Sequence, residues 1–212
     1  MKLSKLVIAS FCLILITSCV KLPNTNQLSS KFFVATQYSP EADFQEYVTY
    51  YVPDSINVAS NDKDDPTSIS DARAKQVLAE IRRNMNARGY IQASSKDSAD
   101  IGVPVTLFKN TGVYSSGYYP GYWWGYPGYP GGGYWGCPGC GYWYPWYGVT
   151  YSYTTGTLIM EFLDLKNSSD EQITIVWNSV MGDVYNTSQP VSEAVDAVNQ
   201  SFTQSPYIQA AN

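Results

Sequence analysis

Residues 157–165 read TLIMEFLDL and residues 172–181 read QITIVWNSVM, with the turn-forming sequence NSSD at 167–170 between them. Both runs are rich in apolar and β-branched residues, which favour strands, and each is about as long as one strand. The pair therefore predicts a β-hairpin. Alternate side chains of the second strand point to one face, and that face is expected to meet the core. Its members are Ile173, Ile175, Trp177 and Met181.

A helix is predicted upstream of the hairpin, between a cap at Ser70 and a terminal glycine at Gly89. Asp71 lies in the first turn, where a carboxylate interacts favourably with the helix dipole, and Arg88 lies in the last. Apolar residues recur in between at helical spacing. They are Ala74, Val77, Leu78, Ile81 and Met85.

A second helix is predicted downstream, from Pro190 to a stop before Pro206, because proline suits the first turn of a helix and does not continue one. Its apolar residues also recur at helical spacing. They are Val191, Ala194, Val195, Val198 and Phe202. Each helix therefore has one face to bury.

Further strands are expected at residues 31–36, 44–52, 90–93 and 100–109. Pro104 predicts a sheet edge or a bulge for the last of these, because proline cannot donate a ladder hydrogen bond. We expect a single α+β domain over residues 43–212, with a mostly antiparallel sheet of about four or five strands and both helices on one face.

The N-terminal residues show the features of a bacterial lipoprotein signal peptide in the expected order. Two lysines precede an apolar run at 6–16, which is too short to span a bilayer as a stable helix. The sequence ITSC at 16–19 then has the form of a lipobox. We expect residues 1–18 to be a cleaved signal peptide and Cys19 to be lipidated. A secretory signal with a chance cysteine and an uncleaved anchor are the alternatives.

Lipidation at Cys19 would fix the location of the protein. A lipobox cysteine carries several acyl chains such as palmitate, and two or more chains anchor a protein stably. Val20 follows the cysteine, in place of the aspartate that retains some lipoproteins in the inner membrane. We expect an outer-membrane anchor in the cell envelope, on its periplasmic or its surface face, with residues 19–42 as a tether.

Composition excludes several function classes. The chain of 212 residues has no histidine, which removes Ser-His-Asp triads, Cys-His pairs and His-ligated metals. A net charge of −5 argues against nucleic acid as a partner. Glu161 and Asp164 are three apart on a strand and so point to opposite faces, which makes a poor glycosidase pair. We expect no enzyme activity, no metal and no cofactor.

The acidic residues at 62–65 resemble half of a calcium loop. The glycine at the sixth position and the closing glutamate of such a loop are missing. We therefore expect a solvated turn.

Residues 114–147, here called the aromatic tract, have an extreme composition. The 34 residues include 10 Tyr, 5 Trp, 10 Gly and 5 Pro, and none is charged. Glycine and proline at this density oppose a regular helix or a central strand, so we expect a long loop inserted between strands. Tyrosine and tryptophan combine an apolar ring with a polar tip, which suits a binding surface for a glycan or an envelope protein.

Three interpretations of the aromatic tract stay open: a low-complexity loop packed on its own domain or on the membrane interface, a binding surface, and a self-associating segment. In a binding surface, the candidate ligand-contacting side chains are aromatic. They are Tyr122, Trp123, Trp124, Tyr126, Trp135, Trp143 and Trp146.

Cys137 and Cys140 form a CxxC motif inside the aromatic tract. A redox motif of this kind normally opens a helix, and none is predicted here. Zinc requires about four ligands, which this sequence cannot supply. We expect a local disulfide that pins the loop, with two free thiols as the alternative.

Several short sequences resemble, in their order and spacing, a family of small Gram-negative lipoproteins. They are DF at 43–44, YVTYYVP at 47–53, NMNARGY at 84–90, SADI at 98–101, GTLI at 156–159, DL at 164–165 and VWN at 176–178. The family carries the domain of unknown function 4136. The resemblance implies a lipid-anchored α+β envelope domain and transfers no catalytic residue.

Together these observations predict a non-enzymatic lipoprotein of the outer membrane that binds a partner through the aromatic tract. The alternative is an accessory subunit of an envelope transport or assembly complex. Such a subunit would dock through a sheet edge or through the basic helix face formed by Arg82, Arg83 and Arg88.

Overall fold

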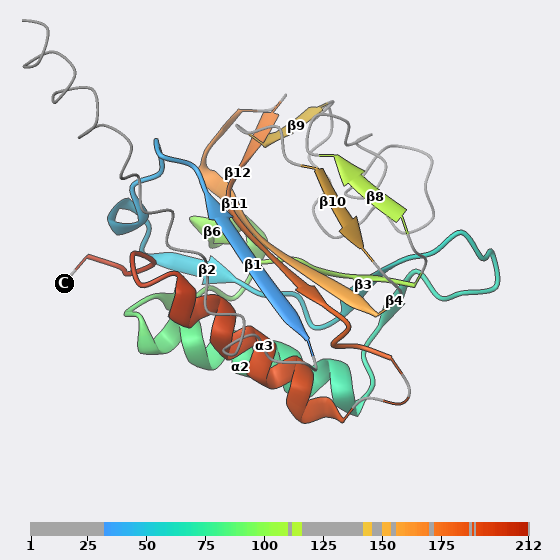
Figure 1. Ribbon diagram of the computed structural model, residues 1–212. Coiled ribbons are helices and arrows are strands. Elements are labelled where there is room, and N and C mark those ends of the chain that lie inside the picture. The colour runs from blue at the N-terminus through green and yellow to red at the C-terminus, as the bar shows by residue number, and fades with distance from the viewer. Residues whose placement is uncertain are drawn as a thin grey trace, which may run out of the picture. The chain divides into compact units, whose positions relative to one another are not determined.

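The predicted hairpin forms the centre of the sheet in the computed structural model (Figure 1). Strands β11 (Thr157–Ser169) and β12 (Gln172–Gly182) pair antiparallel, as expected. The structure describes residues 32–109, 112–115, 142–145, 150–153, 156–169, 172–186, 188 and 190–211. Among them no helix has the length and apolar character that a membrane crossing requires.

Two groups of short strands share one edge of β11. The strands β7 (Val105–Phe108) and β6 (Ile101–Gly102) both pair antiparallel with it. Beyond β7 lie β3 (Ile56–Ala59), which is parallel to β7, and β4 (Ser68–Ile69), which is antiparallel to β3. Beyond β6 lie β2 (Thr49–Tyr51) and β5 (Ile91–Gln92), both in parallel pairings.

The other edge of β12 carries two more strands. β1 (Phe33–Tyr38) pairs antiparallel with the second half of β12, and β9 (Tyr142–Pro145) pairs parallel with its start. The described part of the chain therefore holds a mixed sheet of ten strands. The prediction of four or five mostly antiparallel strands is wrong, because several strands of two to four residues are too short to show a periodic pattern.

β1 and β9 extend the sheet beyond the predicted domain core. β1 overlaps the strand expected at 31–36, and its pairing with β12 brings this part of the predicted tether at 19–42 into the sheet, so the sheet begins earlier in the chain than residue 43. β9 lies within the aromatic tract, where a loop was expected. Its proline is tolerated because Pro145 is the last residue of a strand that pairs, among the described strands, with β12 alone.

Pro104 separates β6 from β7 without shifting their register against β11. The pairs Leu163–Gly102 and Met160–Val105 belong to one continuous alignment, which places Pro104 opposite Glu161. Glu161 donates its N–H to Pro104 O at 3.2 Å, and proline has no N–H to return. The proline thus interrupts a strand inside the sheet, where the sequence predicted an edge or a bulge.

A bulge in the hairpin changes which residues of β12 face the helices. Phe162 pairs with Trp177, but the next residue, Leu163, pairs with Ile175. Val176 is the extra residue, and it belongs to the same core cluster as Trp177, whereas Ile175 does not. The prediction that Ile175 and Trp177 share a face is therefore wrong.

Both predicted helices are present and lie side by side on one face of the sheet (Figure 1). They are α2 (Ala72–Ala87) and α3 (Val191–Gln204). The N-cap of α2 is Asp71 and not the predicted Ser70, because Asp71 Oδ1 accepts the Ala74 N–H at 2.8 Å. Gly89 follows α2 with a φ of +87°, the left-handed conformation expected of a terminal glycine.

The core lies between the two helices and the hairpin. Phe162, Trp177 and Phe202 are fully buried, with ring centroids 4.6 to 6.2 Å apart. Trp177 Nε1 donates to Ser205 Oγ at 2.9 Å, so the polar atom of the indole is satisfied just beyond α3. This packing fixes the position of α3 over β12.

The chain enters and leaves the aromatic tract as a two-stranded ribbon, formed by β8 (Gly112–Ser115) and β10 (Thr150–Tyr153). The ribbon keeps the register of β7 with β11, since the pair Phe108–Thr157 and the pair Gly112–Tyr153 lie on one alignment. Gly156 lies between the two paired regions with a φ of +88°. Among the described residues the ribbon is a separate two-stranded sheet, and its pairing follows the same residue alignment as that of β7 with β11.

We expect Gly156→Ala to destabilise the domain more than Gly89→Ala. Both glycines have positive φ, so either alanine costs about 1 kcal/mol of backbone strain. A Cβ on Gly156 would also lie 2.9 Å from Tyr185 O, whereas the nearest atom to a Cβ on Gly89 is Ala210 Cβ at 3.4 Å. Urea denaturation of both variants measures the difference. Equal losses of unfolding free energy would show that this carbonyl does not constrain the residue.

Candidate functional site

The residues predicted to contact a ligand lie outside those whose side chains the structure describes. They are Tyr122, Trp123, Trp124, Tyr126, Trp135, Trp143 and Trp146, of which the backbone of Trp143 is described as part of β9. Cys19, Cys137 and Cys140 also lie outside the described residues. Lipidation and the disulfide therefore stay predictions. The described structure shows the base of the tract, where Ser115 pairs with Thr150.

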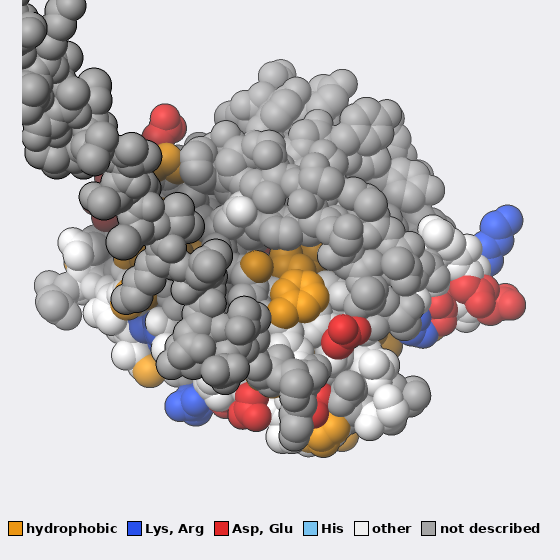
Figure 2. All heavy atoms as spheres, in the orientation of Figure 1, with side chains coloured by type: hydrophobic (Ala, Val, Ile, Leu, Met, Phe, Trp, Pro, Cys, Tyr) orange, Lys and Arg blue, Asp and Glu red, His pale blue; other side chains and the backbone are white. Residues whose placement is uncertain are grey.

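A cleft of about 570 Å³ opens beside Gly156, near the base of the ribbon. A volume of this size is typical of small-molecule sites. The charged residues that line the cleft are Asp62, Asp65, Asp71, Arg73 and Lys109. Acidic side chains gather on the surface where Figure 1 places the loop between β3 and β4 (Figure 2), and this loop supplies Asp62 and Asp65.

Asp65 is firmly held in the cleft. Lys109 Nζ donates to Asp65 Oδ1 and the Ser60 hydroxyl donates to Oδ2, both at 2.5 Å. The bond from Lys109, followed by the bond from Ser60, keeps the pKa of Asp65 below its usual range. Asp65 is thus ionised at neutral pH, and Lys109 balances its charge.

Arg73, Tyr185 and Asp71 form another wall of the cleft. The guanidinium carbon of Arg73 lies 4.4 Å from the centroid of the Tyr185 ring, and its nitrogens donate to the Asn186 and Val184 carbonyls at 2.7 and 3.1 Å. The Tyr185 hydroxyl donates to Asp71 Oδ1 at 3.3 Å. Burial, followed by the charge of Asp71, raises the pKa of Tyr185, so its hydroxyl stays protonated at neutral pH.

The cleft offers hydrogen-bond acceptors more than donors. Asp71 uses Oδ1 for both of its bonds, and Oδ2 has no partner among the described residues. Asp62 Oδ1 accepts the Asp64 N–H at 3.0 Å, and its Oδ2 is likewise unpaired within the described ranges. In the described part of the chain, no group of three or more His, Cys, Asp or Glu side chains is placed so that it could hold a metal ion.

A row of polar side chains crosses the sheet on the face away from the helices. Glu161 lies opposite Asn178, which lies opposite Gln37 of β1. Glu161 is 1% exposed and Asn178 is fully buried. Nevertheless Glu161 Oε1, Gln37 Oε1 and both amide atoms of Asn178 have no hydrogen-bond partner in the part of the chain that the structure describes. Burial raises the pKa of Glu161 to about 8, so this carboxyl is mostly protonated at neutral pH.

Asp164 has different surroundings from Glu161. Its carboxylate accepts the backbone N–H and the side-chain amide of Asn167 at 2.9 and 3.0 Å. It also lies close enough to the Tyr47 hydroxyl to raise the pKa of that tyrosine, although burial is the larger cause. The two carboxyl groups therefore do not share one site.

We expect Glu161→Gln to make stability less dependent on pH. The carboxyl has an ordinary pKa of 4.5 and a folded pKa of about 8. The folded protein therefore binds more protons than the unfolded chain across this window, and stability falls as pH rises through it. The variant should remove this loss of unfolding free energy, which in the wild type reaches on the order of 4 kcal/mol at pH values above the folded pKa. Urea denaturation at pH 4.5, 6, 7.5 and 9 measures it.

The matched control for this variant is Glu41→Gln, which makes the same change at an exposed carboxyl of the same domain. Its unfolding free energy should follow the wild-type pH profile. If both variants keep that profile, the burial of Glu161 does not set the pH dependence.

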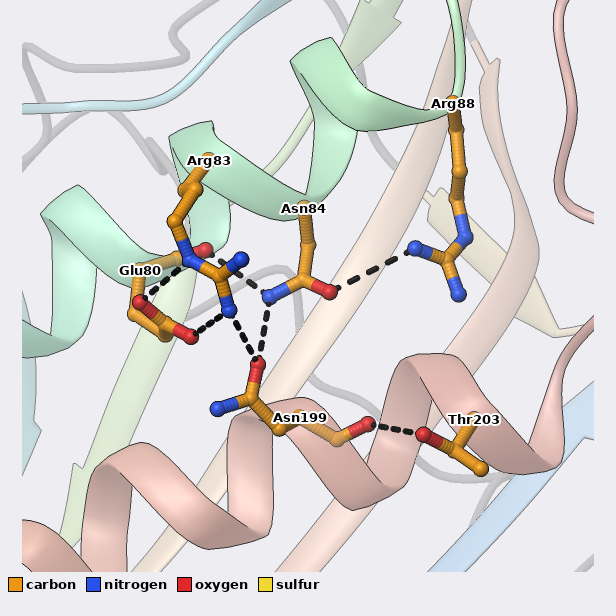
Figure 3. A network of polar contacts seen from close by, with 6 residues as sticks. All are labelled: Glu80, Arg83, Asn84, Arg88, Asn199 and Thr203. Carbon is orange, nitrogen blue, oxygen red and sulfur yellow. Dashed lines mark hydrogen bonds and ion pairs between the residues drawn. The ribbon is translucent and has the colours of Figure 1, made fainter.

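The basic face considered for docking makes many contacts within the domain (Figure 3). Arg88 Nη2 donates to Phe202 O of α3 at 2.7 Å. Asn199 Oδ1 of α3 accepts from Arg83 Nη2 at 3.1 Å and from Asn84 Nδ2 at 2.8 Å. These bonds connect the C-terminal parts of α2 and α3.

Arg82 makes a second set of internal contacts. Its Nη2 donates to the Val52 and Pro53 carbonyls at 3.1 and 3.0 Å and forms an ion pair with Asp54 at 2.8 Å. Charge reversal at Arg82 or Arg88 would therefore disturb the fold as well as any docking, so these residues cannot serve as a clean test of a docking surface.

The described part of the chain defines an α+β domain with one mixed sheet, two helices on one face and a cleft at one end. The chain belongs to the family described as a domain of unknown function (DUF4136), whose model matches residues 34–207. This confirms the resemblance to the family. No curated protein matches the chain.

A solved structure of the same family agrees with this assignment. A DUF4136 family protein from Bacteroides thetaiotaomicron VPI-5482 is 40% identical over 85% of this chain and 99% of its own, with a TM-score of 0.69. A PelC dodecamer from Paraburkholderia phytofirmans is 13% identical over 85% of this chain and 99% of its own, with a TM-score of 0.39. The second similarity is too weak to support an argument.

Proposed function

We propose that this protein is a non-enzymatic lipoprotein, anchored in the outer membrane, whose domain presents the aromatic tract to a glycan or protein of the cell envelope. The observation that supports the proposal is the ribbon. Strands β8 and β10 pair with each other in the same residue alignment as β7 and β11, so the two ends of the tract are held next to each other. A segment held at both ends loses less conformational freedom when it binds a partner.

The membrane anchor in this proposal rests on the sequence alone. Thirteen residues separate Cys19 from the first residue of β1, Phe33. Even fully extended, such a spacer reaches about 45 Å. A lipid on Cys19 would therefore keep the domain, and with it the aromatic tract, close to the membrane surface.

Removing the aromatic tract tests the binding role. Replacing residues 116–149 by Asn-Gly joins Ser115 to Thr150 through a two-residue hairpin turn, at a point where the two residues already pair. The replacement also removes β9, which pairs only with the start of β12 among the described strands. Because the core between the hairpin and the helices is untouched, we expect the domain to stay folded, as circular dichroism would show, and to lose its partner. Co-sedimentation with isolated cell-wall sacculi detects a glycan partner, and photo-crosslinking in intact cells detects a protein.

A variant with a Gly/Ser segment of the original length controls for loop length, and it should fail to bind as well. Undiminished sedimentation and crosslinking in a folded variant without the tract would refute the binding role of the tract.

The anchor has its own test. Wild-type cells should incorporate labelled palmitate into the protein and retain it in the outer-membrane fraction. Cys19→Ala should lose both properties, because the acylated residue is gone. Cys12→Ala is the matched control, since Cys12 lies in the predicted signal peptide and its loss should change neither property. Persistent labelling of Cys19→Ala would contradict the anchor.

The accessory-subunit alternative has less support. The three arginines that would form its docking face are engaged with Phe202, with Asn199 and with the loop after β2. Proteins captured by crosslinking to the α2 face, and not to the tract, would favour this alternative.

A further inference from the structure

The cleft beside Gly156 combines an apolar lining with a polar wall. Leu107 is 3% exposed and Tyr185 is 9% exposed, and Ile69 is half-buried beside them. Arg73 covers one face of the Tyr185 ring. These side chains give the cleft a shaped apolar surface within about 570 Å³, which is the usual environment of a small ligand.

The wall presents acceptors in fixed positions. Asp71 is held by the Ala74 N–H and by the Tyr185 hydroxyl through the same oxygen, Oδ1. Its second oxygen therefore stays available to a ligand. Asp62 Oδ1 accepts one hydrogen bond, from the Asp64 N–H, and its exposed side chain lies on the loop between β3 and β4. A hydroxyl that donates to a carboxylate forms a short, charge-assisted bond.

The charge of the cleft selects against anions. Three aspartates line it together with two cations, Arg73 and Lys109. Lys109 is paired with Asp65, and Arg73 donates to two backbone carbonyls. A phosphate or carboxylate ligand would therefore meet the carboxylates of Asp62 and Asp71 at close range, where like charges repel each other.

We infer that the cleft binds an uncharged saccharide unit. A pyranose ring has an apolar face of C–H groups, which suits the lining of Ile69 and Leu107, and a rim of hydroxyls, which suits the oxygens of Asp62 and Asp71. The inference goes beyond the proposed function, because none of these residues belongs to the aromatic tract.

The test titrates the purified full chain with three uncharged disaccharides, cellobiose, maltose and N,N′-diacetylchitobiose, by isothermal calorimetry. At least one of them should bind. The double variant Asp62→Asn with Asp71→Asn should weaken that binding about tenfold, because each ligand hydroxyl loses a charged acceptor. Asparagine also caps helices, so α2 should keep its N-cap and the variant should keep its melting temperature.

The matched control is Asp97→Asn, which removes one carboxylate from a side chain that is 83% exposed and does not line the cleft. Its affinity should equal that of the wild type. An anionic diuronate completes the set of probes, and it should bind more weakly than the best uncharged disaccharide.

Three results would overturn the inference: no binding of any uncharged disaccharide, equal binding by the folded double variant, or tighter binding of the anionic probe. A full chain with Trp143→Ala and Trp146→Ala separates this inference from the proposed function. It should bind the disaccharide normally, and a loss there would move the site to the aromatic tract. Failure of the wild type to bind sacculi or crosslink would refute the proposed function alone.

Discussion

Burial of Trp177 is the constraint on which the rest of the structure depends. The indole lies against Phe162 and Phe202 and reaches Ser205 through its one polar atom. These contacts fix the register of β11 with β12 and the position of α3 together. A shift of one residue in β12 would turn Trp177 to the opposite face and bring a polar neighbour into the core. Because β1 pairs along the same strand and α2 packs on α3, both follow from this placement.

The elements that could be predicted from the sequence are those with a long periodic signal. The hairpin and both helices extend over enough residues for their apolar spacing to be distinctive. The short strands β4, β5 and β6 have two residues each, and they exist because a neighbouring strand offers free hydrogen-bonding groups. The bulge at Val176 is also invisible in the sequence, since it depends on how two strands align. Local pattern thus predicts the centre of the sheet, and tertiary pairing decides its extent.

The cleft could not be predicted from the sequence. The sequence predicts a solvated turn for the acidic loop that contains Asp65. Its partner Lys109 follows β7 and is distant in the sequence. Arg73 lies on the polar face of a predicted helix, and its partner Tyr185 follows the hairpin. No motif links these residues. These residues lie together because β3 pairs with β7 and because the start of α2 lines the same cleft. The aromatic tract shows the reverse, a conspicuous composition whose side chains lie beyond the described residues.

The pairing of Ser115 with Thr150 has an evolutionary consequence. These two residues lie opposite each other in the ribbon formed by β8 and β10, so the segment between them begins and ends at neighbouring points. Its length and composition can change without moving these points, although a replacement that lacks β9 also loses the pairing with the start of β12. The domain core and the segment between Ser115 and Thr150 can therefore change at different rates. Packing constrains the core, and external contacts constrain the segment.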